Sequence, residues 1–281
     1  MHTIKISNQL LSLDKPLVMG ILNLTKDSFY DGGKYLNQDK AQAHIDKMIK
    51  DGADIIDLGA FSSRPGAEMV SNAEQIKLLE PMVSFLSSQF PNFPISLDIC
   101  HSEIVNELAA ITSFLVNDIS GFSWDDQLIQ SVSNHKLPYV LMHIKGRPTD
   151  MQSKADYKDV TFEILDYMAQ KLHMLNSAGV NEVIIDPGFG FAKTTEQNFE
   201  LLSKLNVFNI FEYPVMVGLS RKSMIYKTLG IMPQDALNGS TALHMTSLMN
   251  GAKILRVHDV KEAKETCTLW EQLQSPELKN I

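Results

Sequence analysis

The side chains best suited to ligand chemistry in this 281-residue chain are polar residues that directly follow short apolar runs. Asp98, Asn117 and Asp186 follow three such runs and supply two carboxylates and one amide. A carboxylate accepts two hydrogen bonds side by side, which suits the edge of a heterocycle with paired N–H groups, such as a 2-amino-4-oxo ring. The alternative for each residue alone is a helix cap or a strand end, where Asp and Asn are common. If the three converge, they predict a site for such a ring.

A second group of polar residues is cationic and indicates an anion site. Arg64, Arg256 and His258 follow other apolar runs, and the segment Ser220-Arg221-Lys222-Ser223 carries two more cations. Arginine presents a planar fork that matches two phosphate oxygens. A helix that begins after Gly218 would add backbone N–H groups directed at the same anion. The alternative is ordinary surface ion pairing of the arginine and the histidine.

Asn23 and Asp27 follow the first apolar run and carry oxygen ligands of the kind that Mg²⁺ prefers. This ion keeps several of its waters and commonly bridges one or two protein oxygens to substrate phosphates. The pair therefore predicts a Mg²⁺ site beside the anion site, and the alternative is the usual role of Asn and Asp in turns.

The apolar runs recur along the chain and alternate with helical patterns. They are short and rich in β-branched residues, which is typical of buried strands, and they cover 17–22, 55–58, 94–97, 114–116, 139–142, 183–185, 215–217 and 252–255. The clearest helical patterns cover 38–50, 73–88, 159–177 and 260–272. This succession predicts an α/β fold, a parallel (β/α)₈ TIM barrel whose polar strand ends meet at one mouth.

The beginning of the chain predicts a separate β-hairpin. Residues 3–6 and 10–13 flank Ser7-Asn8-Gln9, and such a hairpin would lie at the barrel bottom as a plug. No Pro- or Gly-rich linker interrupts the chain, and a barrel of roughly 250 residues fits its length. We therefore expect a single domain over residues 1–281.

Composition excludes several classes of function. A hydrophobic content of 44% supplies a large core, and a net charge of −8 with a pI near 5.5 argues against a nucleic-acid surface, which needs clustered Lys and Arg. The chain has two cysteines, no apolar signal core and no run of membrane-spanning length. We expect a cytoplasmic protein that acts on small molecules, with no nucleic-acid and no membrane partner.

Common catalytic motifs are absent from the sequence. It contains no Cys-x-x-Cys, no His-Glu-x-x-His and no Gly-x-Ser-x-Gly, so it predicts neither a zinc site nor a nucleophile elbow. Most histidines show no metal-ligand spacing. The role of His143, at the end of the fifth run, is left open by the sequence.

The polar segments together resemble the dihydropteroate synthase family of pterin-binding TIM barrels. The resemblance extends from about residue 16 to 260 and rests on six segments in the family's order: Gly20-Ile21-Leu22-Asn23-Leu24-Thr25-x-Asp27-Ser28-Phe29, Ser62-Ser63-Arg64-Pro65-Gly66, Asn117-Asp118-Ile119-Ser120-Gly121, Asp186-Pro187-Gly188-Phe189-Gly190-Phe191, Ser220-Arg221-Lys222-Ser223 and Arg256-Val257-His258-Asp259. It implies a transferase of folate biosynthesis that joins p-aminobenzoate to 6-hydroxymethyl-7,8-dihydropterin diphosphate and releases diphosphate.

The resemblance also implies a role for each matching residue. The pterin would be held by Asp98, Asn117, Asp186 and Lys222, the diphosphate by Ser63, Arg64, Arg256 and His258, the p-aminobenzoate by Phe29, Pro65, Phe191 and Ser223, and Mg²⁺ by Asn23. The residues closest to the chemistry would be Lys222, Arg64, Arg256, His258 and Asp98. Family members are usually homodimers, so a homodimer is expected here.

The implied reaction is a dissociative substitution without an enzyme nucleophile. Diphosphate can leave when Mg²⁺ and nearby cations meet its negative charge. The positive charge on the methylene carbon is then delocalised into the electron-rich pterin ring, near Asp98 and Asp186, and the arylamine attacks.

Departures from the family pattern leave two other interpretations open. Lys26 stands where Pro is usual, Ala60-Phe61 where Gly-Glu is common, and Ala192 where Gly is usual. The altered loops at Lys26 and Phe61 would fit an inactive pterin-binding paralogue. A methyltetrahydrofolate-dependent methyltransferase would share the pterin end but would not need an anion site. Turnover with diphosphate release distinguishes all three.

Overall fold

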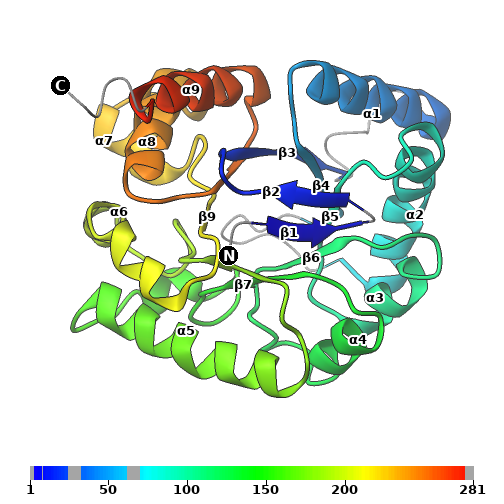
Figure 1. Ribbon diagram of the computed structural model, residues 1–281, viewed down its shortest axis with the longest axis horizontal. Helices are drawn as coiled ribbons and strands as arrows, with labels where there is room; N and C mark the ends of the chain where they lie inside the picture. Colours follow the sequence, from blue (N-terminus) through cyan, green and yellow to red (C-terminus); the bar gives the residue numbers. More distant parts are fainter. Residues whose placement is uncertain (1–2, 8, 25–32, 62–69, 276–281) are drawn as a thin grey trace.

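The predicted barrel strands form one parallel sheet that closes on itself. The computed structural model describes residues 3–7, 9–24, 33–61 and 70–275, with only the backbone for 33–37. The strand order is β8-β7-β6-β5-β4-β3-β10-β9, and a parallel bridge between Ile185 and Val215 joins the two edges. Figure 1 looks along the barrel, with helices around the outside and the hairpin across the near end. The predicted (β/α)₈ barrel with an N-terminal hairpin is confirmed.

Most elements match the apolar runs and helical patterns of the sequence. The strands are β1 (Thr3–Ile6), β2 (Gln9–Ser12), β3 (Leu17–Asn23), β4 (Ile55–Gly59), β5 (Ile95–Asp98), β6 (Leu115–Asp118), β7 (Tyr139–Met142), β8 (Val183–Asp186), β9 (Met216–Val217) and β10 (Ile254–Val257). The α-helices are α1 (Gly33–Lys50), α2 (Asn72–Gln89), α3 (Ser102–Leu108), α4 (Leu128–Asn134), α5 (Val160–Ser177), α6 (Thr195–Ser203), α7 (Ser223–Leu229), α8 (Leu237–Met249) and α9 (Val260–Leu273). Short 3₁₀ helices are η2 (Met151–Lys154), η3 (Leu205–Phe211) and η4 (Pro233–Asp235).

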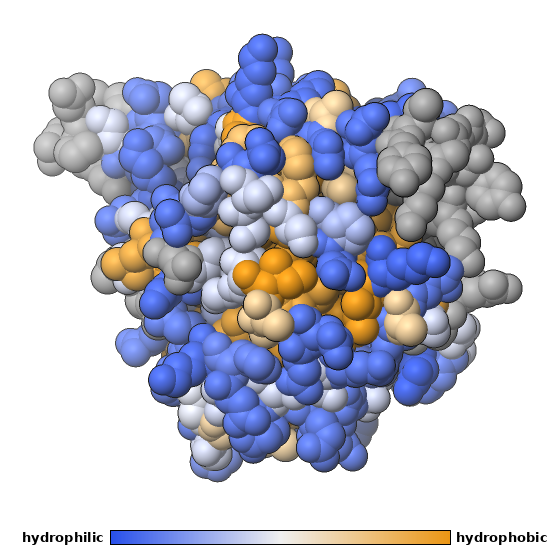
Figure 2. Space-filling view, turned by 90° about the vertical axis from the view of Figure 1, so that its right-hand side faces the viewer, coloured by the Kyte–Doolittle hydropathy of each residue, from blue (hydrophilic) through white to orange (hydrophobic). Residues whose placement is uncertain are grey.

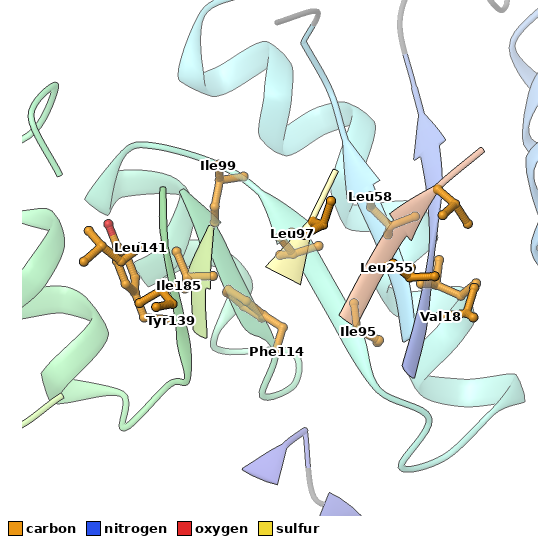
Figure 3. Close-up of a cluster of buried hydrophobic side chains, with 14 of the residues drawn as sticks. Val18, Leu58, Ile95, Leu97, Ile99, Phe114, Tyr139, Leu141, Ile185 and Leu255 are labelled. Atoms are coloured by element: carbon orange, nitrogen blue, oxygen red, sulfur yellow. The ribbon is translucent and has the colours of Figure 1, made fainter. Parts of the chain in front are cut away.

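Alternation along the barrel strands separates two buried environments. Successive side chains point to opposite faces of a strand. One set, including Leu58, Leu97 and Ile185, belongs to the large apolar cluster shared with the helices (Figure 3). Their strand neighbours Asp57 and Asp98 point to the barrel interior and are also buried. The strands therefore use one set of apolar residues to hold the helices, and near their carboxyl ends they direct polar groups to the inside.

The hairpin covers the barrel bottom as predicted. β1 and β2 pair antiparallel, with Ile6 opposite Gln9. Hairpin residues Ile4, Ile6, Leu11 and Leu13 form an apolar cluster with residues near the start of the barrel strands, namely Leu17, Met19, Ile55, Leu115, Val140, Ile184, Met216 and Ile254. Because this apolar layer fills the bottom of the barrel, the polar interior lies above it, towards the carboxyl ends of the strands.

Several strands continue beyond the apolar runs that predicted them. β5 ends at Asp98 and β8 at Asp186, and β6 includes Asn117. The backbone of these polar residues still pairs with neighbouring strands, since Asp98 lies opposite Asn117 in the sheet register. Sheet hydrogen bonds depend on the backbone and not on side-chain hydropathy, so hydropathy alone ends a strand too early. The polar residues are consequently held by the sheet and not by flexible loops.

Side-chain caps start the two helices that flank β8. Asp159 caps α5 by accepting from the backbone N–H groups of Thr161 and Phe162, both at 3.0 Å. A capping box between Thr194 and Gln197 starts α6. The α6 cap lies only a few residues beyond Asp186, so it anchors the far end of the loop that leaves the mouth.

One side of the barrel is largely polar at its surface. Figure 2 shows this side, which lies at the right of Figure 1 and is mainly hydrophilic, with apolar residues gathered near its middle. Within the described residues, the helices are all too short or too polar to span a membrane.

Candidate active site

A cluster of charged and polar side chains occupies the barrel interior above the apolar layer. Its members come from five strands and are Asp57 on β4, Ser96 and Asp98 on β5, Asn117 on β6, Asp186 on β8 and Arg256 on β10. All are buried except Arg256, which is nearly so, with a side chain 15% exposed. Buried charges are stable only when they are paired or hydrogen-bonded. The cluster meets this requirement mainly through its own members.

Arg256 and Asp57 form the centre of the cluster. The guanidinium donates from Nε to Asp57 Oδ2 over 2.7 Å and from Nη2 to Asp98 Oδ2 over 2.8 Å. Asp57, which is 0% exposed, also accepts from Ser96 Oγ at 2.6 Å and from Asn117 Nδ2 at 3.2 Å. Burial works against the charge of Arg256, but the two carboxylates outweigh it and raise its pKa. The arginine therefore stays charged and links three strands.

Asp98 is only half satisfied by this network. Its Oδ2 is bonded to Arg256, whereas its buried Oδ1 has no hydrogen-bond partner within the described part of the chain. Burial raises the pKa of Asp98 to about 7, against the lowering effect of Arg256 and with a further raising effect of Asp57. Buried acceptors are almost always bonded in folded proteins, so an unpaired one in a barrel mouth indicates a place for a ligand N–H group.

Asp186 and Lys222 form a second acceptor and donor pair. Asp186 Oδ1 accepts from the backbone N–H of Gly188 at 2.8 Å, and burial raises its pKa against the opposing charge of Lys222. Lys222 donates to the carbonyl of Phe189, and its ammonium lies 4.5 Å from the ring centre of Phe191. Burial lowers the pKa of Lys222 to about 8, so the side chain is mostly charged at neutral pH.

An apolar cluster lies among the loops of the mouth. It is formed by residues that end or follow strands β4 to β8, namely Phe61, Cys100, Ile119, Met142, Ile144, Met151, Phe191 and Ala192. Such a surface can pack against the face of a flat ring while the carboxylates bind its edge. The mouth thus combines the polar and apolar contacts that a heterocycle requires.

The loops after β9 and β10 place their cations differently. His258 is exposed, and its backbone N–H donates to Ser220 Oγ at 3.3 Å. Arg221 instead forms a bidentate pair with Asp259, with both bonds at 2.8 Å, and donates to the carbonyl of Gln234 at 2.5 Å. Arg221 therefore joins the turn before α7 to the start of α9 and is not available to an anion.

Comparison with known proteins agrees with this geometry. Residues 19–258 match the family described as pterin binding enzyme. The chain is 40% identical over 263 residues to the dihydropteroate synthase of Escherichia coli (strain K12), with 93% of each chain covered. It is 39% identical over 262 residues to that of Bacillus subtilis (strain 168), with 92% of this chain and 89% of the relative covered.

Solved structures give the same result. The Yersinia pestis dihydropteroate synthase in a sulfonamide drug complex has a TM-score of 0.91 and 37% identity, covering 97% of this chain and 99% of that one. The Xanthomonas albilineans dihydropteroate synthase with 4-aminobenzoic acid has a TM-score of 0.91 and 34% identity, with 98% of each chain covered. The chain belongs to the dihydropteroate synthase family.

The structure brings together six of the thirteen site residues predicted for a dihydropteroate synthase. The pterin set Asp98, Asn117, Asp186 and Lys222 lies at the mouth, with Arg256 among them. Phe191 lies in the apolar cluster under Lys222. Further out, Ser223 begins α7, and both it and the exposed His258 lie at the rim. The individual roles of these residues stay predictions.

Four other predicted residues lie outside the described part of the chain. They are Phe29, Ser63, Arg64 and Pro65, from the loops after β3 and β4. Lys26 and Asp27 lie outside it too, whereas Phe61 is buried in the apolar cluster. The departure at Ala192 has a local consequence, because its φ of 47° is in the left-handed region where Gly is favoured.

Sequence reasoning missed two features of the site. Asp57 lies inside an apolar run and is not among the predicted site residues, although a carboxylate inside such a run is itself a signal of a polar interior. Lys193, which is buried against His143, had no sequence signal apart from its place after the Gly-Phe-Gly-Phe segment. Asp57 contacts Arg256, and Lys193 contacts His143. In each pair the two residues are far apart in sequence, so neither pair could be predicted before the fold was known.

The residues at the rim are compatible with a Mg²⁺ ion that has few protein ligands and keeps several of its waters. Asn23 ends β3 with an exposed side chain, and a Cβ placed on Gly59 would lie 3.3 Å from Asn23 Oδ1 and 3.8 Å from Asp98 Oδ2. The described residues contain no group of three or more His, Cys, Asp or Glu that could hold a metal. One amide oxygen fits an ion that keeps its waters and takes its other ligands from substrate phosphates.

Proposed function

We propose that this protein condenses 6-hydroxymethyl-7,8-dihydropterin diphosphate with p-aminobenzoate to form 7,8-dihydropteroate and diphosphate. The observation that carries the proposal is the buried Asp98 Oδ1, an acceptor with no partner among the described side chains, in the same mouth as Asp186 and Asn117. These acceptors match the N–H edge of a 2-amino-4-oxo pterin. Membership of the family and 40% identity to the Escherichia coli enzyme support the same reaction.

The pterin would be bound by groups that the strands already hold in place. Asp98 Oδ1 and Asp186 accept from the ring N–H groups, and Lys222 donates to a ring acceptor. Asn117 donates its amide N–H to Asp57, which orients its oxygen as a further acceptor. Because these positions are fixed before binding, little conformational entropy is lost when the ring enters.

The diphosphate would lie at the rim, beyond the methylene carbon of the pterin. His258, Ser63 and Arg64 would contact its oxygens, with Arg256 beneath them. Mg²⁺ held through Asn23 would add positive charge on the leaving oxygens. Arg256 is already engaged by two carboxylates, so its charge would act on the leaving group without a large movement.

The residues support a substitution in which the enzyme supplies charge and position, not a nucleophile. The bond between the methylene carbon and the diphosphate oxygen breaks, and its electron pair leaves with diphosphate. Asp98 and Asp186 stabilise the resulting positive charge on the dihydropterin. The amine nitrogen of p-aminobenzoate then forms the new C–N bond and loses one proton. Phe191 and Ser223, with Phe29 and Pro65, would border the aromatic acid.

The wider setting of the enzyme is also a proposal. We infer a homodimer, because Leu229, Met232 and Met249 are large apolar side chains exposed on the segment from α7 to α8. Residues 1–281 are expected to form one domain, since all barrel strands share one sheet. A cytoplasmic enzyme is supported by two free, buried cysteines. Analytical ultracentrifugation measures the oligomeric state directly.

The decisive experiment is turnover with both substrates and Mg²⁺. We expect dihydropteroate and diphosphate to form in equal amounts. Chromatography measures the dihydropteroate, and a phosphate-coupled assay measures the diphosphate. Pterin binding without turnover would identify an inactive paralogue. Methyl transfer from methyltetrahydrofolate without diphosphate release would identify a methyltransferase. Either of these results overturns the proposal.

A further inference from the structure

Lys193 is a buried lysine that the proposed reaction does not use. The residue is 3% exposed, and its Nζ lies at hydrogen-bonding distance from three acceptors. These are the carbonyls of Gly188 at 2.8 Å and Phe191 at 3.0 Å, and Nδ1 of His143 at 3.1 Å. An ammonium group has three N–H donors. Protonated Lys193 can therefore satisfy all of them at once, which offsets part of the cost of the burial that lowers its pKa.

The loop that Lys193 holds has an unusual backbone. Between β8 and α6, Gly188, Gly190 and Ala192 have φ values of 75°, 82° and 47°. A side-chain-bearing residue such as Ala192 persists in this conformation only where its surroundings determine it. Lys193 binds two carbonyls of the loop, and Asn198 Oδ1 accepts from the N–H of Gly190 at 2.7 Å. The conformation of the loop is thus imposed by side chains and not by the backbone alone.

The same loop is joined to two groups assigned to substrate binding. Asp186 ends β8 directly before the loop, and its carboxylate accepts from the backbone N–H of Gly188 within it. Phe191 contributes the apolar surface under Lys222, and Lys222 donates to the carbonyl of Phe189. Lys222 therefore holds the loop from the mouth, while Lys193 holds other carbonyls of the same loop.

His143 connects this lysine to the neighbouring strand. Its backbone N–H donates to the carbonyl of Asp186 at 3.1 Å, and its ring packs edge-on against Tyr167 with centroids 4.9 Å apart. A Cβ placed on Gly188 would lie 2.0 Å from the His143 carbonyl, so the loop rests directly on this backbone. Burial and the charge of Lys193 lower the pKa of His143, which keeps the ring neutral and Nδ1 available as an acceptor.

We propose that Lys193 and His143 are positioning residues for pterin binding, acting through Asp186 and Phe191 of the loop that they hold. The inference rests on the proposed function, because it requires a pterin in the mouth. Neither side chain touches the substrate. Their effect is to keep the Asp186 carboxylate and the Phe191 ring in the geometry that binds it.

The first test compares Lys193→Met with Lys204→Met in calorimetric titrations with 6-hydroxymethylpterin. Methionine keeps most of the length of the side chain and removes all three donors, whereas Lys204 is a half-exposed lysine of a 2.7 Å surface pair with Glu200. In folded protein we expect the Kd of Lys193→Met to rise at least about tenfold, the size of effect typical of small misplacements in a site. Lys204→Met should bind as the wild type does.

A second pair of variants covers the case in which Lys193→Met does not fold. His143→Asn places an amide oxygen near the position of Nδ1 and should keep pterin affinity within a few-fold, whereas His143→Leu should lose it as Lys193→Met does. Nitrogen NMR of the wild type should show a neutral His143 ring with the proton on Nε2. Equal affinity of His143→Asn, His143→Leu and wild type overturns the proposal. If the wild type itself binds no pterin, the proposed function has failed instead.

Discussion

The pair between Arg256 and Asp57 allows a quantitative prediction of stability. Arg256→Gln removes the guanidinium from Asp57, which is 0% exposed, and leaves that carboxylate with only Ser96 and Asn117 as donors. Removing one partner of a buried pair typically costs roughly 3–5 kcal/mol of unfolding free energy. The lower end is expected here, because the pKa of Asp98 is already about 7 and this second carboxylate can take up a proton at neutral pH.

A double-mutant cycle separates the pair from its surroundings. Asp57→Asn alone should cost roughly 3 kcal/mol, since the charge-assisted bond from Arg256 Nε and the ion-pair contact of Arg256 Nη2 are weakened. Asp57→Asn combined with Arg256→Gln should cost less than the sum, with a coupling energy on the order of 2 kcal/mol. Urea unfolding followed by circular dichroism measures all four proteins.

The control uses an ion pair of the same length at the surface. Lys15 and Glu271 are 2.8 Å apart, and Lys15 is 73% exposed. Lys15→Gln should leave the urea midpoint unchanged within error. The reasoning is refuted if Arg256→Gln unfolds within about 1 kcal/mol of the wild type, or if the two substitutions are additive. Such a result would mean that solvent, and not Arg256, stabilises the buried carboxylate.

Three further predictions follow from individual residues. Asp186→Asn keeps the bond from Gly188 but replaces the second oxygen with an N–H₂ donor, so the free energy of pterin binding should weaken by roughly 3 kcal/mol. Calorimetry should show Kd rising more than about a hundredfold, and an unchanged Kd would remove Asp186 from the site. Asn23→Ala should raise the Mg²⁺ concentration for half-maximal turnover, and an unchanged Mg²⁺ titration would show that Asn23 is not a ligand. His244 is buried, both its ring nitrogens have no partner among the described residues, and burial lowers its pKa to about 4. Because the unfolded chain binds a proton at His244 more tightly than the folded chain does, the free energy of unfolding should fall as pH drops from about 6.5 towards 4, by roughly 2 kcal/mol at pH 5. His244→Leu should abolish that loss. An equal pH dependence of unfolding in the two proteins would contradict the prediction.

Much of this architecture is encoded locally. Residue type and period determine where short buried strands alternate with helices, so the barrel, its hairpin and the polar strand ends follow from the sequence. Asp98, Asn117 and Asp186 are recognisable because each interrupts an apolar run at its end. Asp57 was not recognised because it lies inside its run, and Lys193 because it follows a glycine-rich turn.

Only the closed barrel decides which of these groups meet. Arg256 and Asp57 are 199 residues apart, and their contact depends on the registers of the strands between β10 and β4, including β3. The sequence predicted Arg256 beside the anion but gave no sign of the two carboxylates with which the structure pairs it. Burial is likewise a property of the whole fold. Burial leaves Asp98 with an oxygen that has no partner among the described residues and with a pKa of about 7. Residue types are local, but the desolvation and the partners that set their chemistry arise from residues distant in the chain.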